Sequence, residues 1–392
     1  MKRLCALLIA LLVLAMAVPA MATWTRVKTM GDQPMYIQDD YNIWFFTSTV
    51  NNYPRHLIVD HSIDAERYQE IGSEDWDGST RVGMIVPAFG SSVIGVFISN
   101  FDVDYPFTPG GMATEADQYI DLFYGYRAAN WDLGVRLDYY NASVENNGTQ
   151  SQGHIGLNAG VGFNINANML ELNAYYRSIS FKYEELGATT TDPIREKDAG
   201  NEMGLAARYL IAYNSMVTLV PQFMYRTQKI SETVTATVPP GLGEGEENKM
   251  TFWDLGVGCN TVPLSGVEFL TSLGVRQFSF EGTDTSGILF DGSFKHFPYI
   301  QFGADIQVKS WLSMRVGAAK VWEAGEDKTP PTPDTKFAQD GFEYSIGAGI
   351  MVGDVQFDAD VRTSWLTDGP YFLSGEDGGD LFVNLSFKYD YR

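Results

Sequence analysis

The stretch HIGLNAGVGFNI, residues 154–165, alternates apolar side chains with polar or small ones at every step. Ile155, Leu157 and Phe163 share one parity, whereas His154 and Asn158 share the other. Because successive side chains of a β-strand point to opposite faces, this alternation predicts a strand with one apolar and one polar face. No stretch of comparable length keeps a helical period, so the sequence indicates an all-β fold.

The same alternation recurs along the chain, in segments longer than those of most soluble sheets. It is found in WDLGVRLDYY (131–140), YIQFGADIQVK (299–309) and VQFDADVR (355–362). A soluble antiparallel sheet also alternates, but its strands usually hold about 5 or 6 residues. The segments here run to roughly 10–14 residues, which matches a tilted strand that crosses a bilayer.

Connections between these segments alternate between tight and long. Turn signals lie near residues 90–92, 128–130, 166–167, 214, 262–265, 310 and 353–354, and long polar stretches near 62–79, 102–116, 142–152, 183–199, 229–249, 281–295, 323–340 and 366–379. Short periplasmic turns with long external loops are typical of outer-membrane barrels. Residues 56–392 are therefore predicted to form a transmembrane antiparallel up-and-down β-barrel of sixteen strands, or of fourteen if the first hairpin is a plug.

Tryptophans near the ends of the alternating segments share the parity of the apolar face. This placement predicts two interfacial girdles at the surfaces of the bilayer. The girdle residues are Trp131, Trp253, Trp322 and Trp365.

The N-terminus has the pattern of an export signal. Lys2 and Arg3 precede an apolar run over residues 4–18, and small residues end at Ala22. The run is shorter than the roughly 20 apolar residues of an anchor helix. Residues 1–22 are therefore predicted to be a cleaved signal peptide, and the protein to reach the bacterial outer membrane.

Residues 82–101 contain no charge and are long enough for a transmembrane helix. Pro87 and the turn signal at residues 90–92 predict a hairpin instead. Both faces of this hairpin are apolar, so its inner face needs a cover. Residues 35–53 are the nearest candidate, and residues 23–55 are predicted to be a periplasmic or plug segment.

The last twelve residues, LFVNLSFKYDYR, resemble the C-terminal strand that the assembly machinery reads in bacterial outer-membrane barrels. Phe387, Tyr389 and Tyr391 would carry that signal, although Arg392 follows the last aromatic residue. The apolar segment and hairpin over 35–101 also resemble, loosely, the long-chain fatty-acid transporter type of barrel. That resemblance implies a plugged barrel for hydrophobic solutes but brings no residue-level motif.

The charge balance excludes some partners. The chain has 49 acidic and 27 basic residues and a net charge of −22, which argues against nucleic acid because phosphates require a basic surface. We expect no metal, cofactor or enzyme activity, because the four histidines lack the partner spacing of a metal centre or a hydrolase. The expected partners are the lipid bilayer, the barrel-assembly machinery and small solutes, and a homo-oligomer is left open.

Charges of both signs share the polar parity of the strands and are predicted to line the lumen. They indicate either a constriction that orients polar solutes or a salt-bridge network that fills the barrel. The candidate lumen residues are Arg136, Arg177, Arg208, Arg276, Arg315, Arg362, Asp138, Asp305, Asp358 and Asp360.

Three functions follow from these patterns. The inward charges favour passive or selective transport of small solutes through a charged lumen, which is the leading hypothesis. The apolar first hairpin favours a plugged transporter of hydrophobic solutes. The long loops favour a structural or adhesive barrel that does not conduct.

Overall fold

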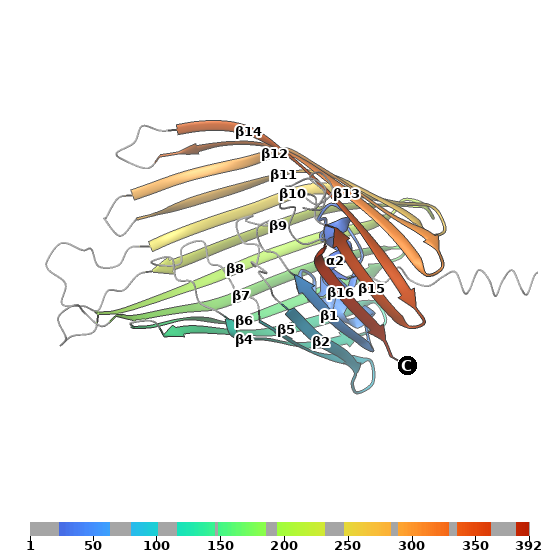
Figure 1. The fold of residues 1–392 in the computed structure, drawn as a ribbon, viewed down its shortest axis with the longest axis horizontal. Coiled ribbons are helices and arrows are strands. Elements are labelled where there is room, and N and C mark those ends of the chain that lie inside the picture. Colours follow the sequence, from blue (N-terminus) through green and yellow to red (C-terminus); the bar gives the residue numbers. More distant parts are fainter. Residues whose placement is uncertain are drawn as a thin grey trace, which may run out of the picture.

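The chain folds as a closed antiparallel barrel of sixteen strands (Figure 1). The computed structural model describes residues 23–62, 80–100, 116–145, 148–185, 194–231, 247–283, 289–328, 335–361 and 382–391. Each strand pairs with the next one along the chain, and the first strand pairs with the last. The sixteen-strand prediction is confirmed, and the fourteen-strand alternative is wrong because the first hairpin belongs to the wall.

The strands differ in length around the barrel. They are β1 His56–Ser62, β2 Thr80–Pro87, β3 Ser92–Ser99, β4 Ala116–Arg127, β5 Trp131–Glu145, β6 Gly148–Ile165, β7 Asn168–Glu185, β8 Ile194–Ala212, β9 Val217–Ser231, β10 Glu247–Leu264, β11 Val267–Thr283, β12 Leu289–Lys309, β13 Leu312–Asp327, β14 Thr335–Val352, β15 Val355–Val361 and β16 Phe382–Asp390.

The tight turns that join β2 to β3, β4 to β5, β6 to β7, β8 to β9, β10 to β11, β12 to β13 and β14 to β15 lie at one end of the barrel, which we call the tight-turn end; the opposite end is the long-loop end. The turn between β2 and β3 contains Gly90 at φ +61°, a left-handed conformation that glycine adopts without a steric penalty. The charge-free stretch 82–101 is therefore a hairpin, as expected, up to the end of β3 at Ser99.

The strands β5 to β14 hold 15 to 21 residues each, more than the sequence indicated. The expected loop at 142–152 is wrong, because β5 continues to Glu145 and β6 starts at Gly148. The beginning of β6, GTQSQG, is polar on both faces. Outside a bilayer neither face needs to be apolar, so a strand can continue where the alternation ends.

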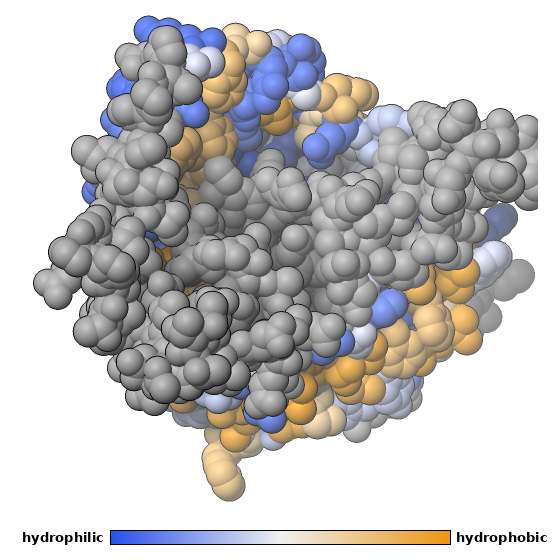
Figure 2. Space-filling view, turned by 60° about the vertical axis from the view of Figure 1, so that its left-hand side comes forward, coloured by the Kyte–Doolittle hydropathy of each residue, from blue (hydrophilic) through white to orange (hydrophobic). Residues whose placement is uncertain are grey.

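The two faces of the wall have the parity that the alternation predicts. On β6, Leu157 is 51% exposed on the outside, whereas Asn158 is 4% exposed on the inside. The other strands behave alike, and Figure 2 shows hydrophobic residues gathered on the outer wall. Outward residues include Leu137, Tyr139, Ile155, Leu205, Leu255, Val257, Leu273, Ile300, Phe357 and Leu385.

Helical structure in the described residues is confined to the N-terminal segment, which we define as residues 23–55. It contains the α-helix α2 (Trp24–Thr29) and two 3₁₀ helices, η1 (Asp40–Trp44) and η2 (Thr47–Asn52). The side chain of Thr23 caps α2 by accepting from the amide of Arg26. Across the ranges that the structure describes, no helix is long and apolar enough to cross a membrane.

The outward face of the central wall is expected to contact lipid. Leu157→Arg should lower the free energy of unfolding by about 2–4 kcal/mol, because it places a charge near the middle of the hydrocarbon layer. Ile165→Arg, at the tight-turn end of the same strand and on the same outward face, should cost only about 0–1 kcal/mol. Denaturant titration in phospholipid vesicles measures both variants, and equal costs would contradict this orientation of the wall.

Candidate functional site

The N-terminal segment lies inside the barrel, toward the tight-turn end (Figure 1). It contacts the inner face of all sixteen strands. The wall residues at these contacts, in strand order, are Ile58, Arg81, Phe97, Phe123, Gly134, Gly160, Asn173, Arg208, Gln222, Gly258, Glu268, Asp305, Gly317, Ser345, Asp358 and Lys388.

One side of the N-terminal segment is apolar and covers the short strands. Ile43 and Val50 pack in one buried cluster with the inner residues of β1 to β4. The ring of Trp44 lies 5.1 Å from that of Phe97 and 5.0 Å from that of Phe123, both edge-on. These contacts account for the apolar inner face of the first hairpin, because the face is buried against protein rather than water.

The opposite side is held by ion pairs, and Arg26 makes three of them. Its guanidinium lies 3.0 Å from Asp39, 2.6 Å from Glu268 and 2.8 Å from Asp305. The Arg26 side chain is only 1% exposed. A planar guanidinium offers five N–H donors, so one side chain can satisfy carboxylates from the segment itself, from β11 and from β12.

Further polar contacts extend this attachment around the barrel. Asp305 and Asp358 both pair with Arg315, at 3.0 and 2.5 Å, and the hydroxyl of Thr23 donates to Asp358 at 2.7 Å. On the neighbouring strand β16, Lys388 lies 2.8 Å from Asp40. The segment is therefore fixed by charge near its start and near its middle.

Arg208 on β8 recognises the backbone of the segment. It donates to the carbonyl oxygens of Met35 and Ile37, at 3.1 and 2.8 Å, and pairs with Glu171 on β7. Backbone carbonyls inside a barrel need donors because water is excluded from them. Arg208 provides such donors.

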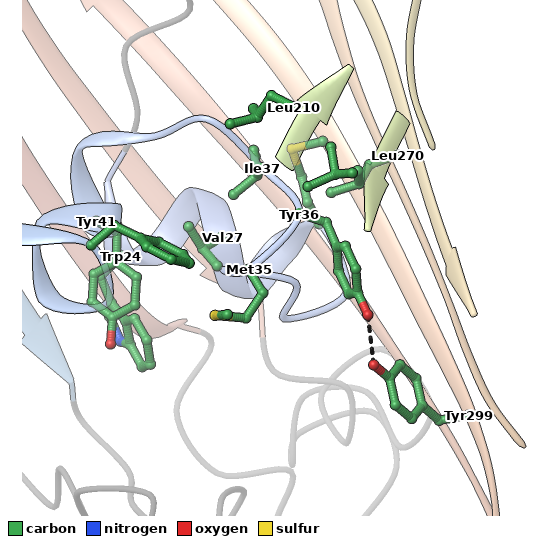
Figure 3. Packing of buried hydrophobic residues seen from close by; sticks show 12 residues of the cluster. Trp24, Val27, Met35, Tyr36, Ile37, Tyr41, Leu210, Leu270 and Tyr299 are labelled. Atoms are coloured by element: carbon green, nitrogen blue, oxygen red, sulfur yellow. Dashed lines mark hydrogen bonds between the residues drawn. The ribbon is translucent and has the colours of Figure 1, made fainter. Parts of the chain in front are cut away.

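Tyr36 links the segment to β9, β10 and β12 through buried hydroxyls. Its hydroxyl lies 2.6 Å from that of Tyr299 (Figure 3), which donates to Asp254 at 2.7 Å. Burial, with the charge of Asp254, raises the pKa of Tyr36 to about 12, so the hydroxyl stays protonated at neutral pH. Tyr36 and Tyr299 belong to one buried cluster, which extends through Val27 to Trp24 and Tyr41 (Figure 3).

Inward-facing glycines let the backbone of the segment approach the wall. A Cβ atom at Gly134 would overlap the carbonyl of Thr47, and one at Gly317 would overlap the backbone nitrogen of Gly31. Any larger residue would push the segment away from β5 or β13. Glycine is required at these two positions because the backbone of the segment lies close to the wall, and not because the φ angle is unusual.

The described lumen residues predicted from sequence face inward, but they do not form one ring. Arg208, Arg315, Asp305 and Asp358 take part in holding the N-terminal segment. Arg136 lies over the ring of Trp44 in the segment, at 5.3 Å, whereas Arg177 and Asp138 pair with each other further toward the long-loop end. Asp360 accepts from Asn384 at 3.0 Å, and Arg362 is outside the described residues.

The remaining candidate arginines also have carboxylate partners. Arg136 lies 3.1 Å from Asp121, and Arg177 lies 3.0 Å from Asp138. Arg276 on β11 pairs with Asp254 at 3.2 Å. All five described candidate arginines therefore have a carboxylate partner.

Beyond the N-terminal segment, toward the long-loop end, lies a region that we call the upper lumen. Its inner wall carries buried apolar residues on two arcs. One arc, on β4 to β9, contains Tyr119, Tyr140, Ala142, Ile179, Phe181 and Ile230. The other, on β10 to β12, is a row of rings in which Phe278 lies 4.7 Å from Phe252 and 4.5 Å from Phe294.

The described girdle residues lie on the outward parity of their strands. Trp131 and Trp322 are 38% and 40% exposed on the outer wall, Trp253 is half-buried, and Trp365 is outside the described residues. Tyr391 donates its hydroxyl to the carbonyl of Ile85 at 2.8 Å, beyond the neighbouring strand. Their roles in the interface and in assembly stay predictions.

The sequence interpretation did not identify the charges of the N-terminal segment. Asp39 and Asp40 were given no role from the sequence, but both are buried and pair with Arg26 and Lys388. A signal was present in the wall, since glycines recur at inward positions near the tight turns. Because these glycines leave space along the inner wall, they indicate that another part of the chain occupies the lumen.

The sequence matches no protein-family model and no curated protein. Similar solved structures include the ferric yersiniabactin uptake receptor FyuA from Yersinia pestis, at 11% identity and a TM-score of 0.43, over 78% of this chain and 53% of the receptor. This chain thus spans about half of that receptor. The toluene transporter TbuX from Ralstonia pickettii matches at 8% identity and a TM-score of 0.43, over 95% and 100% of the two chains.

The monoaromatic hydrocarbon channel CymD matches at 8% identity and a TM-score of 0.39, over 95% of this chain and 98% of the channel. Similarity at this level identifies neither a family nor a solute for this chain.

Removing the charge of Arg26 should release the N-terminal segment from the wall. Arg26→Gln leaves Asp39 and Glu268 without their cation and leaves Asp305 with Arg315 alone, and breaking a buried ion pair costs about 3–5 kcal/mol. We expect stable open channels for this variant in planar bilayers and few for the unmodified protein. Lys249→Gln, which breaks an exposed pair with Glu281, is the control and should stay silent. Equal conductance of Arg26→Gln and Lys249→Gln would refute this role of Arg26.

A side chain at Gly134 should weaken the contact between η2 and β5. Gly134→Ala is expected to cost about 1–3 kcal/mol, because a methyl group there forces the backbone of Thr47 to move. At Gly341 a Cβ would meet nothing within 4 Å, so Gly341→Ala should be neutral. Denaturant titration of both variants in vesicles provides the comparison, and a neutral Gly134→Ala would show that the segment is not closely packed there.

Proposed function

We propose that this protein is an outer-membrane transporter for a small, largely apolar solute, and that residues 23–55 are its plug. Under this proposal residues 1–22 are the export signal and residues 56–392 the barrel. The lining of the upper lumen is the observation that carries the proposal. A water-filled diffusion pore has a polar lumen, whereas Phe181, Ile230 and Phe278 face inward and are at most 3% exposed.

The outer wall supports the membrane location. Hydrocarbon offers no hydrogen bonds, so a sheet in a bilayer must close on itself, and this one pairs β1 with β16. Apolar side chains such as Leu157 and Leu255 are about half exposed on its outside, which is costly in water but favourable in lipid. The tight turns would then face the periplasm.

The leading hypothesis from sequence, a charged lumen for polar solutes, receives less support. A constriction orients polar solutes through unbalanced charges that face each other across water. Here Arg136 and Arg177 lie against carboxylates on the same stretch of wall. The pairs therefore support a salt-bridge network, and the aromatic arcs support the hydrophobic solute.

An adhesive or structural barrel is favoured by none of these contacts. Such a barrel needs a filled interior, which the salt bridges and the N-terminal segment already provide. It does not need the two apolar arcs on the inner wall of the upper lumen. Transport of an apolar solute, in contrast, requires apolar residues on the inner wall.

Uptake by intact cells tests the proposal. A bacterial strain without its major porins, expressing this protein, should take up radiolabelled p-xylene faster than the empty strain, while L-arginine uptake stays unchanged. The Arg26→Gln variant should admit arginine as well, which controls for the presence of folded barrels. Faster arginine uptake by the unmodified protein would favour the charged pore, and no effect on either solute would favour the structural barrel.

A further inference from the structure

Gln228 lies on the inner face of β9 and is fully buried, at 0% exposure. It shares parity with Gln222, whose amide donates to Tyr36 inside the barrel at 3.1 Å. Among the described residues, neither the amide nitrogen nor the amide oxygen of Gln228 has a hydrogen-bond partner. Buried polar side chains almost always have partners, so this unsatisfied amide requires an explanation.

The polar neighbours of Gln228 are engaged elsewhere. Its partner across the strand pair on β8 is Glu202. Glu202 accepts from Arg226 at 2.9 Å and also lies 3.7 Å from Arg177. The charges beside Gln228 therefore neutralise one another and leave the amide with both a donor and an acceptor to offer.

Two further neighbours of Gln228 are apolar. Ile230, two residues further along the same face, belongs to the apolar arc on β4 to β9. On the other side, the partner of Gln228 on β10 is Met250, which is 2% exposed. The row formed by Phe252, Phe278 and Phe294 starts next to it. Gln228 is thus the polar point between the two arcs of the upper lumen.

We propose that Gln228 is the recognition point of a solute site in the upper lumen, and that the site takes a small aromatic molecule with one uncharged hydroxyl group. This inference rests on the proposed function and specifies its solute. A hydroxyl both donates and accepts, which matches the two unsatisfied atoms of an amide. A charged group would lack a counter-ion there, because Arg226 and Glu202 are already paired.

Two isosteric probes test the site. p-Cresol and p-xylene have the same shape and differ by a hydroxyl in place of a methyl group. Their dissociation constants are measured by equilibrium dialysis against the full-length protein in detergent, at neutral pH. Gln228→Met keeps the volume but removes the amide. We expect it to shift the ratio of the two constants about tenfold in favour of p-xylene, which corresponds to one lost hydrogen bond.

Gln339→Met on β14 is the matched control, since this glutamine is exposed, and it should leave the ratio unchanged. Folding of each variant is checked by its heat-dependent shift in gels, and Gln228→Leu replaces Gln228→Met if the latter does not fold.

An unchanged ratio in the folded variant would overturn the site, and so would a failure of the unmodified protein to bind p-cresol. Neither result contradicts the proposed function if cells that express the protein still take up p-xylene. Loss of that uptake would instead refute the function itself.

Discussion

The guanidinium of Arg26 faces three carboxylates inside a closed barrel, and only one of them comes from its own segment. Glu268 and Asp305 belong to the wall, where burial without a cation would be costly. Wall and segment therefore satisfy each other, and neither has a balanced charge alone. Breaking such a buried arrangement on one side is strongly unfavourable. The position of residues 23–55 depends on these ion pairs with the wall more than on their short helices.

Once the segment is fixed, the interior divides into two regions with different chemistry. Near the tight turns the space is filled by backbone, and glycines such as Gly317 leave room for it. Toward the long loops the inner wall carries paired charges and the two aromatic arcs. A polar solute would gain little from carboxylates that are already neutralised. An apolar solute would gain from rings that water would otherwise have to cover.

The wall was predictable from sequence, because alternation at residues such as Leu157 and Asn158 reports directly on the two faces of a strand. Strand ends were not, since backbone pairing continues to Glu145 and from Gly148, beyond the stretch that alternates. The inward arginines were predicted, but the ion pairs of Asp39 with Arg26 and of Asp40 with Lys388 were not. A segment without periodic pattern gives no sign of which side chain meets which wall. The unsatisfied amide of Gln228 likewise depends on neighbours from β8 and β10 that only the fold brings together.

Hydrogen–deuterium exchange of the full-length protein in lipid nanodiscs tests most directly whether residues 23–55 close the lumen. If the segment is packed against all sixteen strands, its amides should exchange as slowly as those of the central strands, because opening requires the buried ion pairs to break. Exchange of these amides within seconds, beside protected strands, would contradict the account, since a freely moving segment leaves a water-filled passage through the barrel.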